Sequence, residues 1–244
     1  MHQRLQNMRD ECKLRMSSWT FTDGIRGVVL NLDFLRDKGV SPCFLRQWRD
    51  GIALSADVIR PRHRANHPSM KQHDQWAEIE WSRLERLGKV TCLLGTSRPD
   101  SLNVNPCASI LKEQHGASND APETDRYKAR LIVDLRRGGV NPHLPAVEVH
   151  YGTVEQAVLQ FSVNDFIFIL DLQDCFFNWR VAPTDAWLLG FYSPARRQFG
   201  KFEYLPNGLK SAPGINDGSV KEILRVLKLN TDIHLRYMPL RVAV

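Results

Sequence analysis

The stretch Phe166-Ile-Phe-Ile-Leu-Asp-Leu-Gln-Asp-Cys-Phe-Phe177 is the most informative part of this sequence. Its apolar run is typical of a buried strand, and that strand is predicted to end at a carboxylate, Asp171. An aromatic pair follows. Because neighbouring residues of a strand face opposite sides, either Phe176 or Phe177 must belong to the core. The stretch therefore predicts a rigid strand that presents an acidic side chain at its end.

Two further segments, one on each side of this stretch, complete a pattern. Lys128-Ala-Arg-Leu-Ile-Val-Asp-Leu-Arg136 lies upstream, within a predicted strand of alternating charge at 127–135. Leu205-Pro-Asn-Gly-Leu-Lys-Ser-Ala-Pro213 lies downstream, and its proline and glycine residues indicate a turn that leads into a helix.

In this order the segments resemble the fingers, palm-carboxylate and template-grip motifs of reverse transcriptases of retrotransposons and retroviruses. The Leu-Pro-x-Gly-Leu form is closer to the retrotransposon enzymes. The resemblance covers about residues 72–244 and implies an α+β fold of fingers and partial palm, with an antiparallel palm sheet backed by helices. It divides the chain into a basic, partly irregular N-terminal extension at 1–70 and a reverse-transcriptase-like part at 71–244.

The resemblance implies nucleotidyl transfer directed by an RNA or DNA template-primer, with deoxynucleotides as substrates and Mg²⁺ as cofactor. Such chemistry uses two cations roughly 3.5–4 Å apart, and carboxylates are the ligands that Mg²⁺ prefers. Asp171 matches the family's first palm position, so it is the expected catalytic and metal-binding residue. Asp174 falls where the family binds no metal and is expected to be structural.

The same resemblance assigns nucleotide- and template-binding roles. Arg130 is expected over the triphosphate, where a guanidinium suits phosphate oxygens, and Phe176 matches the position that excludes a ribose 2′-hydroxyl. Asp134 is expected to brace the fingers strand through an ion pair. The family's fingers lysine is replaced by Glu123, which leaves Lys128 as an imperfect substitute. The full expected set is Arg130, Arg136, Phe176, Asn207, Gly208 and Lys210.

The second palm motif of the family is broken in this sequence. That motif is an aromatic residue, any residue, then two aspartates, and here Tyr237-Met238 is followed by Pro239 and Leu240. Neither side chain can ligate a cation. With the chain ending at Val244, the sequence predicts a degenerate, truncated domain without polymerase activity in this form. Two alternatives remain open, a non-catalytic nucleic-acid-binding domain and a non-functional retroelement relic.

The composition of the sequence indicates which partners, metal sites and cellular locations are compatible with it. A net charge of +6 and a pI of about 9.2 favour a polyanionic partner, although the excess is modest. The 5 cysteines contain no CxxC pair, which favours free thiols over a zinc site. His63 and His67 are spaced for a shared metal only on a helix, which the flanking prolines oppose. Without a secretory signal or membrane-length apolar run, the chain is expected to be soluble and intracellular, with no membrane partner. Its oligomeric state stays open.

Local patterns predict the remaining elements. A glycine, Gly88, is a natural stop for the first helix, and a capping box at Thr153 begins the second. Helices are predicted at about 72–87, from Thr153 and at about 217–227, and strands at about 103–112, 127–135, 186–191, 199–204 and 233–244. Segments 60–68 and 115–125 are predicted loops.

Overall fold

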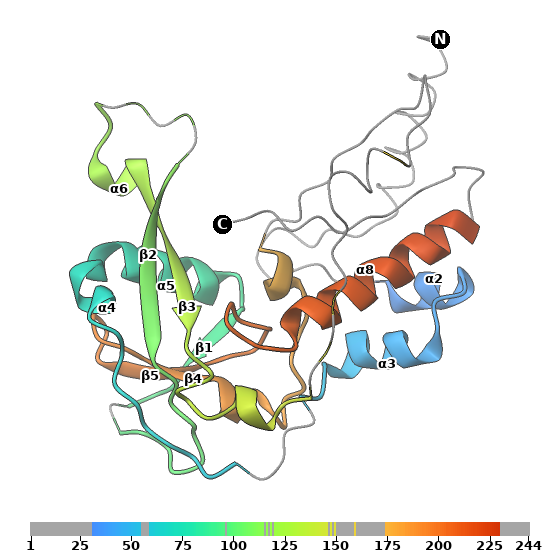
Figure 1. Cartoon of the computed structure of the whole chain (residues 1–244), viewed down its shortest axis with the longest axis horizontal. Helices are drawn as coiled ribbons and strands as arrows, with labels where there is room; N and C mark the ends of the chain where they lie inside the picture. Colours follow the sequence, from blue (N-terminus) through green and yellow to red (C-terminus); the bar gives the residue numbers. More distant parts are fainter. Residues whose placement is uncertain are drawn as a thin grey trace.

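The computed structural model describes residues 31–54, 59–95, 97–114, 120–145 and 174–229, together with isolated positions between them. The predicted strand 166–170, Asp171, and the helix predicted from Thr153 lie outside the described residues, as does everything from residue 230 onward. Within the described part, antiparallel strands and packed helices form one layered arrangement (Figure 1). The α+β fold class expected from the sequence is confirmed.

Two antiparallel sheets organise the described residues. One has the order β1 (Val90–Cys92), β5 (Gln198–Phe202), β4 (Gly190–Ser193), and the other pairs β2 (Cys107–Glu113) with β3 (Tyr127–Val133). Helix α5 (Asp74–Arg86) packs against both β3 and β1, so it joins the two sheets (Figure 1). The β2–β3 pair extends beyond this helix as a hairpin (Figure 1).

The other helices are short except for one. The α-helices are α2 (Leu32–Asp37), α3 (Pro42–Asp50), α4 (Ser69–Gln72), α6 (Glu123–Arg126) and α8 (Ala212–Leu229), and the 3₁₀ helices are η1 (Asn141–His143), η2 (Cys175–Asn178) and η3 (Ala186–Leu189). The predicted strand at 186–191 is therefore wrong over its first half. Buried apolar residues of η3 imitate the pattern of a buried strand, which periodicity alone cannot separate from a short helix.

The helix predicted at 72–87 is confirmed, with one break. His73 separates α4 from α5, because its ring Nδ1 lies 2.9 Å from the Ser109 hydroxyl oxygen and 3.1 Å from the Ser109 carbonyl. Asp74 in the first turn and Arg83 in the last complement the helix dipole. Gly88, with φ of 65°, ends the helix as expected.

An aromatic stack forms the centre of the core. The Trp81 ring of α5 lies parallel to Phe191 of β4, with centroids 4.0 Å apart, and Phe202 of β5 tilts against both. Trp81 is only 1% exposed. Aromatic pairs contribute beyond the area they bury, so this stack fixes α5 on the sheet.

A buried amide network lies beneath the β4 strand. Asn103 and Asn105 are both 0% exposed, and Nδ2 of Asn103 donates to Oδ1 of Asn105 over 3.0 Å. The Oδ1 atom of Asn103 accepts the backbone N–H of Arg62. The side-chain amides of Asn103 and Asn105 also donate to the backbone carbonyls of Gly138, Leu188 and Gly190. These residues keep 103–106 irregular, so the strand predicted at 103–112 begins only at Cys107.

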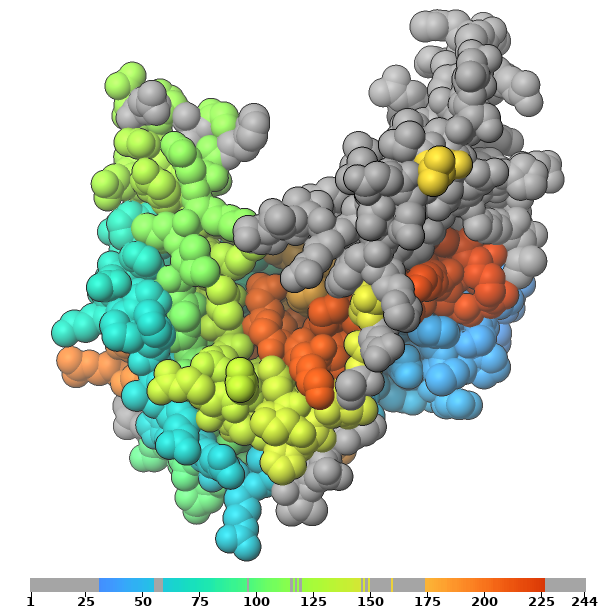
Figure 2. Space-filling model, in the orientation of Figure 1, coloured from blue at the N-terminus to red at the C-terminus, as the bar shows by residue number. Residues whose placement is uncertain are grey.

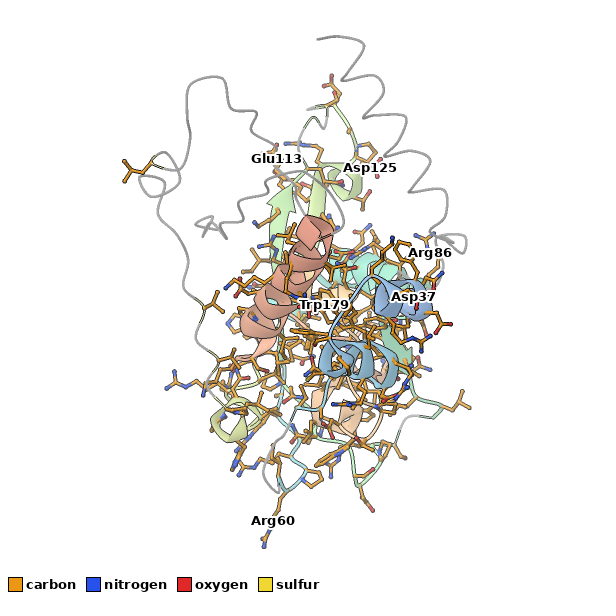
Figure 3. All side chains as sticks on the ribbon, turned by 90° about the vertical axis from the view of Figure 1, so that its right-hand side faces the viewer. Asp37, Arg60, Arg86, Glu113, Asp125 and Trp179 are labelled. Atoms are coloured by element: carbon orange, nitrogen blue, oxygen red, sulfur yellow. The ribbon has the colours of Figure 1, made fainter. Side chains whose placement is uncertain are left out.

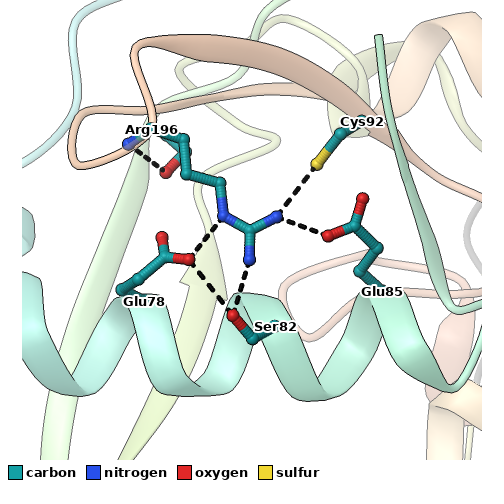
Figure 4. Close-up of polar contacts among 6 residues, drawn as sticks. Glu78, Ser82, Glu85, Cys92 and Arg196 are labelled. Atoms are coloured by element: carbon teal, nitrogen blue, oxygen red, sulfur yellow. Dashed lines mark hydrogen bonds and ion pairs between the residues drawn. The ribbon is translucent and has the colours of Figure 1, made fainter.

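A guanidinium ties the β4–β5 turn to helix α5. Strands β4 and β5 pair as a hairpin, and Arg196 in its turn reaches the acidic face of α5 (Figure 4). There it bonds the carboxylates of Glu78 and Glu85 and donates to the Ser82 hydroxyl over 2.6 Å. Because these helix residues are spaced one turn apart, a single planar guanidinium spans the face.

Helix α8 is longer than predicted and carries the α2–α3 pair. It begins at Ala212 because proline is tolerated in a first helical turn, and Gly214 approaches the Val147 side chain too closely for a Cβ atom. Trp48 of α3 stacks on Trp179, with centroids 5.9 Å apart, and donates to the Ser219 hydroxyl of α8. Part of the predicted N-terminal extension is thus helical and packs on α8, while a domain boundary near residue 70 remains a prediction.

Candidate nucleic-acid interface

The β2–β3 hairpin has one buried and one exposed face. Residues on the first face pack toward α4 and α5; they include Cys107, Ser109, Ala129, Leu131 and Val133. On the second face Ile110 lies opposite Arg130, and Lys112 lies opposite Lys128. We call these four residues the hairpin face. All four are exposed, and Ile110 keeps 48% of its accessible surface.

The hairpin face concentrates positive charge. Lys112 and Lys128 are directly opposed across the strands, where like charges repel and weaken the pairing. None of the three cationic side chains has a carboxylate partner among the residues that the structure describes. At the far end of the hairpin Glu113 and Asp125 lie close to each other (Figure 3). In the part of the chain that the structure describes, the face therefore presents cations with no bonded carboxylate beside an exposed apolar side chain.

Arg136 and Asp134 differ from expectation. Arg136 lies in the turn that follows β3, not on the hairpin with Arg130, although it is exposed as a phosphate-binding residue must be. The Asp134 carboxylate accepts the backbone N–H of Arg137 over 2.9 Å. It therefore stabilises that turn, in the manner typical of aspartate, where we had predicted an ion pair.

The two flanking sequence motifs meet in the structure. The Val133 N–H at the end of β3 donates to the Asn207 carbonyl over 3.0 Å. Asn141 holds the same loop from the other side, because it donates to the Gly208 carbonyl and accepts the Lys210 N–H, each over 2.9 Å. The Lys210 ammonium donates to the Leu144 carbonyl over 3.2 Å. The expected template-grip loop is thus fixed against the base of the hairpin.

Gly208 is required by this contact. Its φ is 105°, and a Cβ atom there would lie 2.0 Å from the Val133 carbonyl oxygen. The resemblance to reverse transcriptases implies a nucleotide- or template-binding role for this glycine. In the structure it allows close approach of the β3 backbone, and the nucleic-acid role of Asn207, Gly208 and Lys210 remains a prediction.

The segment after the expected palm strand is held by an ionic cluster. Asp174 has a φ of 51°, and its carboxylate accepts from Arg83 of α5 over 2.6 Å and 3.1 Å. Glu80 binds the same guanidinium, and both carboxylates raise the pKa of Arg83. Phe177 is buried, whereas Phe176 is partly exposed at the edge of the core. One of the two rings belongs to the core as expected, but both lie in the 3₁₀ helix η2 and not on a strand, so strand alternation is not the reason. The sugar-selecting role of Phe176 remains a prediction.

Lys89 is a buried cation that the sequence did not single out. Its ammonium lies 3.9 Å from the centroid of the Tyr204 ring, and the residue is only 5% exposed. Burial lowers its pKa to about 8, although Asp174 acts in the opposite direction. A Gly-Lys dipeptide after a helix looks like an ordinary surface turn, so no sequence signal marks this residue.

The described residues do not test the expected two-cation centre. Among them there is no group of His, Cys, Asp or Glu that could hold a metal ion. Asp171 lies outside them, as do Pro239 and Leu240, which stand in the sequence where the paired aspartates would be. The Mg²⁺ expectation therefore remains a prediction.

Comparisons with known proteins include likenesses to retroviral proteins. No protein-family model matches the sequence. It is similar to the Gag-Pro-Pol polyprotein of Sheep pulmonary adenomatosis virus, at 24% identity over 200 residues, which cover 77% of this chain and 10% of the polyprotein. The fold is similar to the crystal structure of the prototype foamy virus protease-reverse transcriptase, with a TM-score of 0.52 and 17% identity, over 71% of this chain and 20% of that one.

These likenesses establish a coarse origin. Both are to retroviral proteins, so the chain is retroelement-derived, and its α+β fold is similar to that of one part of a viral protease-reverse transcriptase. The chain spans about a tenth of the polyprotein and about a fifth of the solved structure. In the part of the chain that the structure describes, no helix has the length and apolar character needed to cross a bilayer.

Replacing Gly208 by alanine should lower the free energy of unfolding by about 2–5 kcal/mol. The positive φ contributes about 1–2 kcal/mol, and the clash with Val133 contributes the rest. Gly88→Ala is the matched control, because its φ is also positive but nothing lies within 4 Å of the added Cβ atom. Urea denaturation measures both. Equal losses in the two variants would contradict the proposed contact.

Lys89 should make stability rise with pH. Its folded-state pKa of about 8 lies below the ordinary value of 10.5, so between these pH values the unfolded chain binds more protons and each step upward favours the folded state. Between about pH 7 and pH 9.5 we expect a gain of about 2 kcal/mol in the free energy of unfolding, relative to Lys89→Met. Parallel pH profiles of the two proteins, by urea denaturation, would show that Lys89 keeps an ordinary pKa.

Proposed function

We propose that this chain is a retroelement-derived reverse-transcriptase domain that binds nucleic acid and does not polymerise it. The hairpin face carries the proposal. Lys112, Lys128 and Arg130 are exposed and have no carboxylate partner among the described residues, and Ile110 lies among them. The Asn207–Lys210 loop is fixed at the base of the same hairpin.

Phosphate chemistry explains why such a face suits nucleic acid. Cations that neutralise phosphates release condensed counterions, and this term supplies most of the sequence-independent affinity. Arg130 can bind two phosphate oxygens at once through its planar guanidinium, while the lysines act as point charges. Repulsion between Lys112 and Lys128 is relieved when a polyanion lies across the strands. An RNA or DNA template-primer is the proposed partner.

Loss of polymerase activity follows from the sequence of the second palm motif. Asp171 supplies one carboxylate, and Pro239 and Leu240 supply none. Each metal ligand contributes charge stabilisation worth several kcal/mol, and each ~1.4 kcal/mol is about tenfold in rate. Two such losses place nucleotidyl transfer below detection. A deoxynucleotide can still contact Arg130 through its triphosphate, so in this proposal Arg130→Ala weakens nucleotide binding without unfolding the chain.

The buried polar contacts of the described structure favour a folded binding domain over a non-functional retroelement relic. The buried amides of Asn103 and Asn105 have hydrogen-bond partners, and Gly208 retains the one residue type its position accepts. Random substitution would disrupt such sites early, because each tolerates few alternatives.

The double variant Lys128→Gln/Arg130→Gln should bind duplex nucleic acid more weakly and with less salt dependence. Two lost phosphate contacts reduce the slope of log affinity against log salt by about 1.8 for a duplex. Fluorescence anisotropy with a labelled duplex measures this. Arg46→Gln/Arg86→Gln is the control, because it removes the same charge from exposed positions on α3 and α5. If both double variants lose the same slope, binding depends on net charge and the hairpin face is not the interface.

Primer extension on a poly(rA) template should give no product with Mg²⁺ or Mn²⁺. The expected reason is the missing pair of carboxylates, which the parallel variant Pro239→Asp/Leu240→Asp reintroduces in sequence. Extension by the unaltered chain that disappears in Asp171→Ala would show that the second palm motif has been misidentified.

A further inference from the structure

A second basic surface lies below the hairpin, on the segment at 59–68. Its backbone is extended at His63, which forms a parallel bridge to Val104. The Val104 N–H donates to the Arg62 carbonyl over 2.7 Å, and the Arg64 N–H donates to the Val104 carbonyl over 3.2 Å. The His63 ring packs on Phe199, with centroids 5.6 Å apart. Because neighbours on an extended backbone face opposite sides, Arg62 and Arg64 project away from Phe199.

The turn after β3 adds more arginines to this surface. Gly139 has a φ of 82°, and a Cβ atom there would lie 3.2 Å from Nη1 of Arg62. The Arg62 guanidinium therefore lies beside the turn that exposes Arg136 and Arg137. Figure 2 shows the two segments next to each other on one face, below the hairpin.

The charges of this surface are not neutralised within the described part of the chain. Arg83, Arg196 and Arg225 all bond to carboxylates. The exposed arginines here have no such partner among the described residues, and Arg60 projects at the end of the molecule opposite Glu113 and Asp125 (Figure 3). We name this set the arginine track; it consists of Arg60, Arg62, Arg64, Arg136 and Arg137.

We propose that the arginine track is a second nucleic-acid contact, which binds the phosphodiester backbone of a single strand of RNA or DNA. Alternate residues of an extended segment are about 6.6 Å apart, so Arg62 and Arg64 can meet separate phosphates of an extended strand. Among the described residues, the segment at 59–68 and the turn after β3 belong to no long helix or strand that could enter a duplex groove. Sequence-independent contact with a flexible strand is the mode that fits.

The inference rests in part on the proposed function, because it extends the same class of partner to a separate surface. The hairpin face and the arginine track share no residue, so their contributions can be removed one at a time. An acidic protein surface would also suit the track electrostatically. It is the less favoured partner because arginines in an extended row match the repeated charge of a phosphodiester chain.

The experiment measures binding of the whole chain to labelled poly(dT) and poly(rU) single strands, and to a blunt duplex, across a salt series. The variant Arg62→Gln/Arg64→Gln should lose about 1.4 from the single-strand salt slope, which is about a 25-fold loss of affinity at ~0.1 M salt. Its affinity for the blunt duplex should change much less. Arg46→Gln/Arg86→Gln, on α3 and α5, should leave single-strand binding close to that of the unaltered chain.

Further variants separate folding and the two proposals. Arg60→Gln/Arg64→Gln keeps the contact between Arg62 and Gly139, so it should fold normally and show a similar loss. The inference is wrong if both track variants bind single strands as tightly as the unaltered chain. It is also wrong if Arg46→Gln/Arg86→Gln reduces single-strand binding by the same amount as the track variants. The proposed function fails separately, if Lys128→Gln/Arg130→Gln leaves duplex binding unchanged. A loss confined to one of the two polymers would identify it as the strand that the track binds.

Discussion

The buried amides of Asn103 and Asn105 are the interaction on which the rest of the described structure depends. Each amide has to satisfy its donors and acceptor away from water, since an unpaired buried polar group costs about 1–3 kcal/mol. They do so with backbone groups from three distant parts of the sequence, around Arg62, Gly138 and Leu188. An apolar contact would let these three segments slide past one another. The directional hydrogen bonds instead fix the position of each segment relative to the others. The turn after β3, the arginine track and the β4 strand are consequently fixed by one buried pair.

The position of the template-grip loop likewise depends on close contact between two backbone segments. Gly208 brings its backbone against Val133, while Asn141 bonds both sides of the loop. The base of the hairpin is thus held from two directions, by the amide network through the turn and by the loop through β3. Retroelement-derived segments that are far apart in sequence become a single rigid support for the hairpin face and the track.

The sequence predicted the elements that are stabilised by contacts between residues close in sequence. It missed the features that depend on contacts between residues far apart in sequence. Helix α5, the β2–β3 hairpin and the β4–β5 hairpin are stabilised by neighbours in sequence, and their patterns predicted them. The break at His73 depends on Ser109, and the need for a glycine at position 214 of α8 depends on Val147, so neither leaves a local signal. At the candidate site, exposed Arg130 follows from strand alternation. The place of Arg136 in a turn, the pairing of Asp174 with Arg83 and the burial of Lys89 require knowledge of distant partners.

The opposed lysines near the far end of the hairpin give it a gradient of local stability. At Val133 the strand is bonded to the Asn207 loop, whereas toward Tyr127 the ladder has to overcome the repulsion between Lys112 and Lys128. Amide hydrogens there should exchange with solvent fastest, and that end opens at a lower free energy than the base. Added salt screens the repulsion and slows this opening. The charges of the hairpin face therefore set the local stability of the hairpin, as well as its suitability for a polyanion.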